Sequence, residues 1–82
     1  MTINKAVAIR TSKLLLEKEL TCYKLAKKTG LPESTIENIM AERQKDVRLS
    51  TIYKLAFGFD MTFIEFLNTK EFFDVDLIKD LN

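Results

Sequence analysis

The side chains that could carry out covalent or metal chemistry are scarce in this chain. Its 82 residues include no histidine and a single cysteine, Cys22. A zinc site needs several His or Cys ligands and a His-based triad needs an imidazole, so both are excluded. The carboxylates form no clear active-site grouping, and so small a core rarely encloses a deep pocket. We therefore expect no catalytic residue, no enzyme activity, no metal or other cofactor and no small-molecule ligand.

The remaining chemistry is charge and hydrogen bonding, and the charge is unevenly placed. The formal net charge is only +1, but residues 1–48 contain ten Lys or Arg against six Asp or Glu, whereas residues 49–82 contain three against six. All six phenylalanines lie at Phe57 or beyond. This division favours a basic N-terminal half suited to an anion and an acidic, aromatic half suited to burial or to another protein.

The composition is that of one small domain. A hydrophobic fraction of 46% supports a single core, although a chain of this length leaves roughly 40% of its unfolded surface wet. There is no apolar run long enough to span a membrane and no secretory signal, so we expect a cytoplasmic protein. A lone cysteine excludes a disulfide framework, so packing must stabilise the fold.

Helix signals begin with two helices that are separated by a very short turn. The first helix is expected over residues 3–18, with Thr2 or Asn4 as its N-cap. Thr21 is a good N-cap for the second, and Gly30 suits the left-handed residue that ends it. Pro32 then opens a third helix, because the N–H that proline lacks would be unpaired there.

Two more helices are expected after a charged loop. Residues 41–48 have no apolar periodicity and indicate a loop, and a fourth helix follows over about 49–59. Thr62 and Glu65 form a capping box that opens the fifth helix, and Met61 and Phe66 are placed to act as its hydrophobic staple. The inward-facing residues predicted for the first four helices are Val7, Leu14, Leu25, Ala26, Thr29, Ile36, Ile39, Leu49, Ile52, Leu55, Ala56 and Phe59.

The C-terminal segment is open to two interpretations. Its alternation from Phe73 to Leu77 is typical of a strand, but Asp74 could equally cap a helix that aligns Leu77, Ile78 and Leu81. We favour the helix. The expected organisation is a domain over residues 1–68 and an extension over residues 69–82 that serves tail packing or dimerisation.

The stretch LTCYKLAKKTGLPESTIENIM, Leu20 to Met40, meets the steric needs of a helix-turn-helix. Together with LSTIYKLAFGFDMTFIEFL it resembles the phage-repressor (Cro-type, xenobiotic-response-element) helix-turn-helix family over about residues 3–68. The resemblance implies an all-α, five-helix, lambda-repressor-like domain with a short C-terminal extension. The positions in register with the family pattern are Leu25, Ala26, Gly30, Ile36, Leu55, Ala56 and Leu67.

What the resemblance implies about function is a sequence-specific DNA-binding transcriptional regulator. It is expected to be a repressor that binds double-stranded DNA as a homodimer on an operator. Asn38 could pair with adenine, Ser34 could donate or accept, and Glu33 could accept from cytosine. The residues expected to reach base edges are Glu33, Ser34, Glu37 and Asn38. Those expected to contact phosphate are Thr21, Cys22, Arg43, Lys45 and Arg48.

Several residues depart from the family pattern. Cys22 stands where Gln is usual, Thr11 where a core Ile is common, and Asp60 where Gly usually follows the fourth helix. Cys22 is either a small filler or, at a helix N-terminus that could lower its pKa, a thiol sensor; we favour the filler. More seriously, residues 31–42 contain Glu33, Glu37 and Glu42 and no base, so nonspecific DNA affinity should be weak and a partner subunit necessary. The lysines of the second helix, which either flank phosphate or are merely solvated, are Lys24, Lys27 and Lys28.

The surplus apolar residues have two explanations. The first helix carries a second apolar stripe, Ile9 and Leu16, beside the one that faces the core. Either the tail folds back over Ile9, Leu16 and Phe57, or these apolar residues pair two chains, and we favour pairing. The predicted dimer interface consists of Phe57, Met61, Phe63, Phe72 and Phe73. Two alternatives to the operator-binding regulator remain: an antitoxin-type regulator that also binds a toxin protein, and an interaction adaptor without DNA binding.

Overall fold

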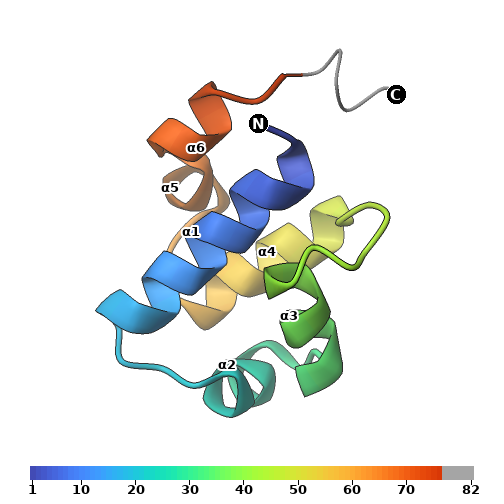
Figure 1. Cartoon of the computed structure of the whole chain (residues 1–82). Coiled ribbons are helices and arrows are strands. Elements are labelled where there is room, and N and C mark those ends of the chain that lie inside the picture. The colour runs from blue at the N-terminus through green and yellow to red at the C-terminus, as the bar shows by residue number, and fades with distance from the viewer. Residues whose placement is uncertain (77–82) are drawn as a thin grey trace.

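The protein is all-helical, as predicted. The computed structural model describes residues 1–76, and within that range there is no strand. Figure 1 shows α1 crossing the middle of the molecule, with α2 and α3 at one end and α5 and α6 at the other. The helices are α1 (Ile3–Glu17), α2 (Cys22–Thr29), α3 (Glu33–Met40), α4 (Leu49–Gly58), α5 (Phe63–Leu67) and α6 (Lys70–Phe73).

Threonine hydroxyls begin three of these helices, because each accepts a hydrogen bond from a backbone N–H that the first turn leaves unpaired. Thr2 rather than Asn4 caps α1, and Thr21 caps α2. Thr62 and Glu65 form the predicted reciprocal box, with the Thr62 N–H 2.8 Å from Glu65 Oε1. Pro32 differs slightly from the prediction, since it occupies the N-cap position and α3 begins at Glu33.

The left-handed conformation appears just after four helices. Gly30 has a φ of 77°, as expected of a glycine at that position. Asp60, with a φ of 58°, adopts the conformation that glycine usually provides at this site. Glu19 and Glu42 do the same at 53° and 57°. The chain thus turns sharply after α1, α3 and α4 without a glycine.

The core lies where helices α1 to α5 meet. Phe59 and Phe66 are its largest fully buried side chains, and their rings stack at 6.5 Å. Leu49 was predicted to face inward, and this is wrong, because it is 61% exposed. Side chains lean toward the N-terminus of a helix, so Leu49, the first residue of α4, points past the helix end. The buried cluster comprises Val7, Leu14, Leu15, Leu25, Ile36, Ile39, Ile52, Leu55, Ala56, Phe59 and Phe66.

Helices α2 and α4 approach each other closely at Gly58. A Cβ atom at this position would lie 2.5 Å from Thr29 Cγ2 and 2.8 Å from Leu25 Cδ1, both of which are side-chain atoms of α2. Only glycine fits without a shift of these neighbours. The contact fixes α2, and with it the following turn, against the end of α4.

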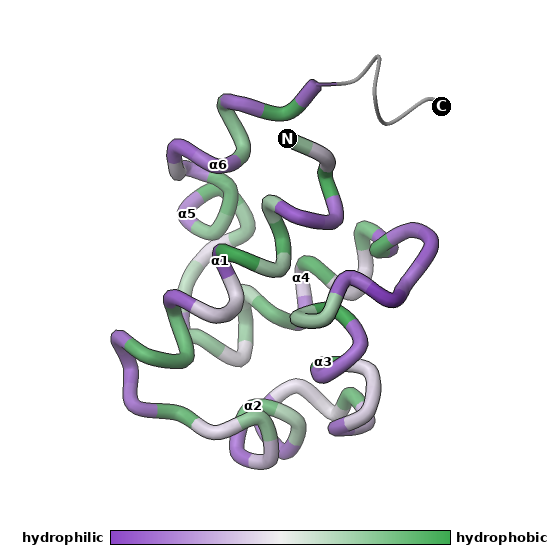
Figure 2. The backbone as a smooth tube through the Cα atoms, viewed as in Figure 1, coloured by the Kyte–Doolittle hydropathy of each residue, from purple (hydrophilic) through white to green (hydrophobic). Residues whose placement is uncertain are grey.

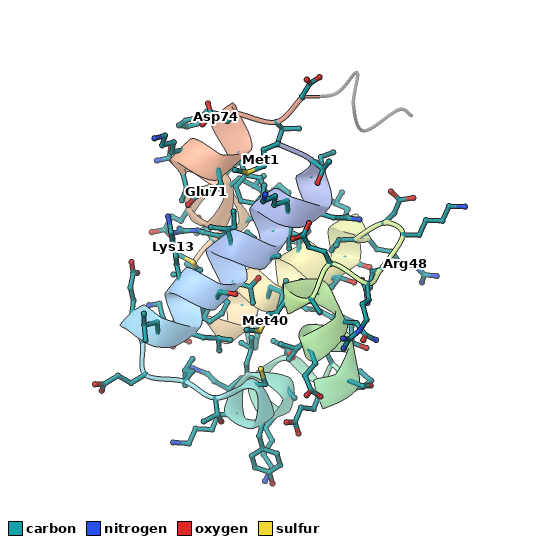
Figure 3. All side chains as sticks on the ribbon, in the orientation of Figure 1. Met1, Lys13, Met40, Arg48, Glu71 and Asp74 are labelled. Carbon is teal, nitrogen blue, oxygen red and sulfur yellow. The ribbon has the colours of Figure 1, made fainter. Side chains whose placement is uncertain are left out.

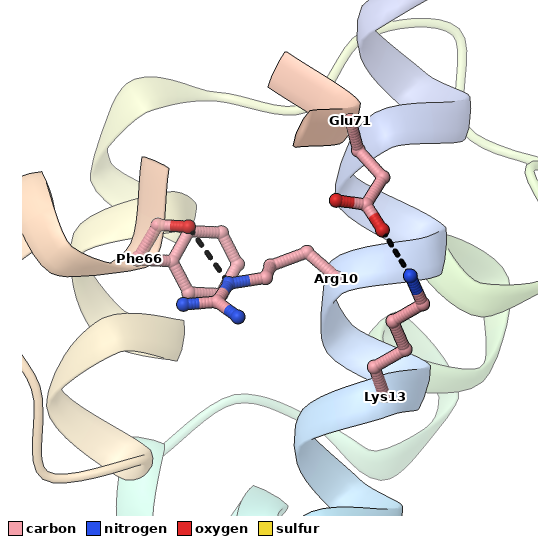
Figure 4. Close-up of polar contacts among 4 residues, drawn as sticks. All are labelled: Arg10, Lys13, Phe66 and Glu71. Atoms are coloured by element: carbon pink, nitrogen blue, oxygen red, sulfur yellow. Dashed lines mark hydrogen bonds and ion pairs between the residues drawn. The ribbon is translucent and has the colours of Figure 1, made fainter. Parts of the chain in front are cut away.

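Polar contacts hold the C-terminal part of the chain on α1 (Figure 4). Arg10 donates from Nε to the Phe66 carbonyl at 2.9 Å and from Nη2 to the Glu65 carbonyl at 2.9 Å. Lys13 forms an ion pair with Glu71 of α6. The hydrogen bond from Lys13, together with a backbone N–H, lowers the pKa of the buried Glu71 carboxyl from 4.5 to about 2.

The extension is helical at its start, but not where the sequence predicted. Phe73 ends α6, so a strand that starts there is wrong. Asp74 is the C-cap of α6, and the two residues after it are not helical. The pairing of Glu71 with α1 favours a helix whose N-cap, Thr69, lies five residues before Asp74, the N-cap that the local pattern indicated. The residues that the predicted helix would have aligned, Leu77, Ile78 and Leu81, lie outside the described residues.

Candidate nucleic-acid interface

The corner between α2 and α3 is closed by hydrogen bonds at both sides of Gly30. The Gly30 N–H bonds to the Ala26 carbonyl at 2.9 Å. Thr29 Oγ1 donates to the Leu25 carbonyl at 2.9 Å and accepts the Leu31 N–H at 3.2 Å. The side chain of Thr29 thus links the end of α2 to the turn, so α3 begins at a defined angle.

One side of α3 is buried and the other is open. Ile36 and Ile39 are 0% and 1% exposed and pin the helix to the core. Glu33, Ser34 and Glu37 are exposed on the outer side, and Asn38, which follows them, is half-buried. Eight residues give α3 a length of about 12 Å, similar to the width of a DNA major groove, about 12 Å. Glu33, Ser34 and Glu37 are therefore open to solvent.

The loop between α3 and α4 is hydrophilic (Figure 2) and is tied to the start of α1. The Asn4 side-chain amide donates to the carbonyls of Gln44 and Lys45, each at 2.9 Å. The sequence offered Asn4 only as a possible cap, and no local signal indicates this contact. Because the loop is held at its centre, its cations keep a defined place beside α3.

Two of the predicted phosphate contacts share a hollow with α3. Lys45 and Arg48 are exposed side chains at this hollow, and Figure 3 labels Arg48 on the loop. Thr35 and Gln44 also line it, and neither residue was predicted from the sequence to be part of the site. Thr35 was overlooked because it falls between the outward and inward positions of α3. The full lining is Thr35, Gln44, Lys45, Asp46, Arg48 and Thr51.

The third cation, Arg43, pairs with Asn38 at the end of α3. Its N–H bonds to the Asn38 carbonyl at 2.9 Å, while the N–H of Glu42 bonds to the Ile39 carbonyl at 3.1 Å. With Glu42 left-handed, this is the Schellman motif of a helix C-terminus. In addition, Arg43 Nε donates to Asn38 Oδ1 at 2.9 Å. The structure therefore joins a predicted base contact to a predicted phosphate contact.

Cys22 lies in an environment that disfavours the thiolate. Its Sγ is 3.6 Å from Met40 Sδ. Burial raises the pKa of the thiol above its ordinary value, and the negative charges of Glu37 and Glu33 raise it further. The lowered pKa on which the sensor interpretation depended is therefore wrong. Cys22 acts as a small filler between α2 and α3.

The lysines of α2 are exposed, and two of them have partners within the chain. Lys27 Nζ lies 4.8 Å from the centre of the Tyr23 ring. Lys28 Nζ is 3.0 Å from Asp60 Oδ2. Both contacts are at the surface, where such pairs contribute little to stability. The two lysines can therefore exchange these partners for a phosphate at small cost.

Helix α4 carries an apolar stripe beside its buried side. Leu49, Tyr53 and Phe57 recur every four residues and are 61%, 54% and 72% exposed. The Tyr53 ring stacks on Phe63 of α5 at 4.2 Å with an angle of 11°. We call these four residues the α4 stripe. Monomeric soluble proteins rarely expose a contiguous apolar surface of this kind unless it binds another molecule.

The other predicted interface residues divide between the surface and the core. Met61 is half-buried and packs against the core from beside the stripe. Phe73 is 73% exposed on α6. Phe72 packs on the core, with its ring 5.9 Å from that of Phe66. Phe72 thus serves the packing of the tail, although Leu16 and Phe57 remain uncovered at 82% and 72% exposure.

The comparisons with known proteins agree with this geometry. A crystal structure of the wild-type restriction-modification controller protein C.Esp1396I has the same fold, with a TM-score of 0.75 and 22% sequence identity, and the alignment covers 95% of this chain and 91% of that chain. No curated protein matches the sequence. Within residues 1–76, no helix has the length and apolar character needed to cross a bilayer.

The family itself is identified by sequence. The model of the Cro/C1-type HTH DNA-binding domain matches residues 10–71, which is most of the chain. This range includes the whole helix-turn-helix, the loop between α3 and α4, and the α4 stripe. The chain therefore belongs to the Cro/C1-type helix-turn-helix family of DNA-binding transcriptional regulators.

Proposed function

We propose that the protein is a cytoplasmic repressor that occupies an operator as a homodimer, with one α3 helix in each of two successive major grooves. The observation that carries this proposal is the open outer side of α3 with Lys45 and Arg48 at its edge. A helix that is anchored by two isoleucines and bordered by cations can enter a groove while the cations contact the phosphates on either side. Repression then follows from occupancy.

The proposed contacts keep the roles expected from the sequence. Glu33, Ser34, Glu37 and Asn38 supply the base contacts, because they form the outer side of α3. The phosphate contacts come from Arg43, Lys45 and Arg48, and from the N-terminus of α2 at Thr21 and Cys22. The Cys22 side chain is packed against Met40, so the contribution of this position is its backbone N–H.

The charge of the site is the reason that we propose a dimer. Residues 33–48 hold four acids and three bases, so one copy has little general attraction for a polyanion. Two linked copies place two reading helices about 34 Å apart, and the second binding event becomes intramolecular. The α4 stripe offers a self-complementary apolar surface for a two-fold axis.

A second function remains compatible with the exposed aromatic surface. Ile64 and Phe73 are 71% and 73% exposed on α5 and α6. They could receive a basic protein, as expected of an antitoxin-type regulator. We rank this function second, because the residues of the α4 stripe form one row, whereas Ile64 and Phe73 lie on separate helices.

The experiment that tests the proposal combines DNA selection with sedimentation. Wild-type protein should select a two-fold symmetric motif from a random duplex pool at a stated salt concentration and should sediment as a dimer. Phe57→Glu should sediment as a monomer and lose most of its operator affinity. Leu16→Glu is the matched control, because Leu16 is at least as exposed as Phe57 but belongs to α1 and not to the stripe.

Two results would contradict the proposal. An asymmetric selected motif would show that the protein does not bind the operator as a symmetric dimer. Equal sedimentation and operator affinity of Phe57→Glu and Leu16→Glu would show that the α4 stripe is not the dimer interface.

A further inference from the structure

The pairing of Asn38 with Arg43 changes what the end of α3 can read. The Schellman motif brings the third-last residue of the helix beside the second residue after its C-cap, and that contact is usually apolar. Here it is polar, because Arg43 Nε lies 2.9 Å from Asn38 Oδ1. Arginine has only donors, so the amide atom that faces it must be the oxygen. The orientation of the Asn38 amide is therefore fixed by chemistry.

An asparagine that reads adenine uses both ends of its amide. The oxygen accepts from adenine N6 and the nitrogen donates to N7. In this protein the oxygen already accepts a charge-assisted hydrogen bond, which is stronger than a neutral one. What Asn38 can offer a base is then its two N–H donors and the one lone pair that Arg43 leaves on the oxygen, and the guanidinium of Arg43 adds further donors beside them.

Resting on the proposed entry of α3 into the major groove, we propose that Asn38 and Arg43 form one donor-rich reading unit that selects guanine instead of adenine. Guanine presents two acceptors, N7 and O6, at its major-groove edge, whereas adenine presents one acceptor and one donor. The donors of this unit match both acceptors of the first edge, whereas the adenine N6 amino group finds only the remaining lone pair of Asn38 Oδ1, beside a guanidinium, as its acceptor. Arg43 acts here as a positioning residue for Asn38, in addition to contributing charge.

The two possible roles of Arg43 are separated by Arg43→Lys. Lysine keeps the positive charge and can still contact phosphate, but it lacks the planar Nε–H that holds the amide. If Arg43 serves phosphate alone, the variant retains the base preference of the wild type. If it orients Asn38, the variant changes the preference at one position of each half-site.

The test is a competition assay in which every half-site position of the selected duplex is replaced by each of the four base pairs. Wild-type protein should prefer guanine at one position by about 5- to 150-fold, and Asn38→Ala should abolish this preference. Arg43→Lys should lose the guanine preference or shift it to adenine, whatever the change in its overall affinity. The double variant should be no less selective than Asn38→Ala alone, because the two residues act as a unit.

Thermal melts of each variant show whether it is folded. Lys45→Ala serves as the matched control variant in the same loop. It should weaken all duplexes alike and leave the guanine preference intact. Adenine as the base preferred by the wild type, an unchanged preference in Arg43→Lys, or losses that multiply in the double variant would each overturn the assignment. Failure of the wild type to bind any duplex would instead overturn the operator function, and this assignment with it.

Discussion

Replacement of Thr11 by valine should stabilise the protein. Thr11 is 0% exposed in the middle of α1, and its Oγ1 has no hydrogen-bond partner. A buried hydroxyl without a partner costs about 1–3 kcal/mol, since it has lost its hydrogen bonds to water. Valine has nearly the same shape and the same branched Cβ, so packing and helix propensity change little. We expect the free energy of unfolding to rise by about 1–2 kcal/mol.

Thr29→Val is the matched control, because it is the same chemical change at a hydroxyl whose hydrogen bonds are made. Thr29 Oγ1 bonds to the Leu25 carbonyl and to the Leu31 N–H. Its loss leaves that N–H without its partner at the turn before α3. The variant should lose about 1–2 kcal/mol.

Thermal and urea unfolding measure both changes. For a domain of this size, 1 kcal/mol moves the melting temperature by about 4–8 °C. Thr11→Val should therefore melt above the wild type and Thr29→Val below it, with at least about 8 °C between the two variants. A melting temperature of Thr11→Val at or below that of the wild type would refute the reasoning, because it would mean that the Thr11 hydroxyl is satisfied in the folded protein.

Three further predictions concern other contacts. Gly58→Ala should lower the free energy of unfolding by about 1 kcal/mol, because the added methyl overpacks the contact with α2 by more than the gain in helix propensity; calorimetry that finds a more stable protein would contradict the close approach. The pKa of Glu71 is lowered to about 2 from 4.5, so its stabilisation is complete above about pH 5 and is lost as the pH falls toward 2. It should amount to about 1–2 kcal/mol, after allowance for the solvent around the exposed Lys13. Urea titrations at pH 7 and pH 3 should therefore show a smaller loss in Glu71→Gln than in the wild type, and equal losses would exclude the ion pair. Asn4→Ala should release the loop carbonyls and weaken binding to all duplexes alike in fluorescence anisotropy, whereas a change in base preference would show that the loop does more than hold phosphates.

The features that the sequence predicted correctly are those decided within a few residues. Thr21 and Thr62 cap helices through N–H groups three positions later, and Gly30 ends α2 by its own backbone freedom. The inward set of α3 follows from helical spacing alone. Such signals need no knowledge of which helices meet, so they are readable from one sequence.

The features that were missed depend on contacts between distant segments. Gly58 looked like an ordinary residue of α4, and its role appears only once α2 is known to pack there. Asn4 reaches a loop some forty positions away. The helix of the C-terminal extension was predicted at the wrong residues for the same reason. Its local pattern indicated Asp74 as the N-cap, whereas the helix that contains Glu71, the partner of Lys13, ends at Phe73.

The candidate site shows both kinds of outcome. The outward positions of α3 could be named from the sequence, but the partnership of Asn38 with Arg43 could not. It requires Glu42 to adopt a left-handed conformation, which is uncommon for glutamate and is not indicated by its neighbours. Whether the named residues touch bases or phosphates stays a prediction.

The tight fit of α2 against Gly58 has a consequence for the DNA that the protein can accept. In a dimer joined through α4, this fit couples each reading helix rigidly to the two-fold axis, with no hinge between them. One extra base pair between half-sites shifts the second by about 3.4 Å and turns it by roughly 35° around the duplex. A protein built in this way cannot follow that rotation without losing its subunit contact or twisting the DNA, so the length of the spacer becomes as strict a requirement as the bases on either side of it.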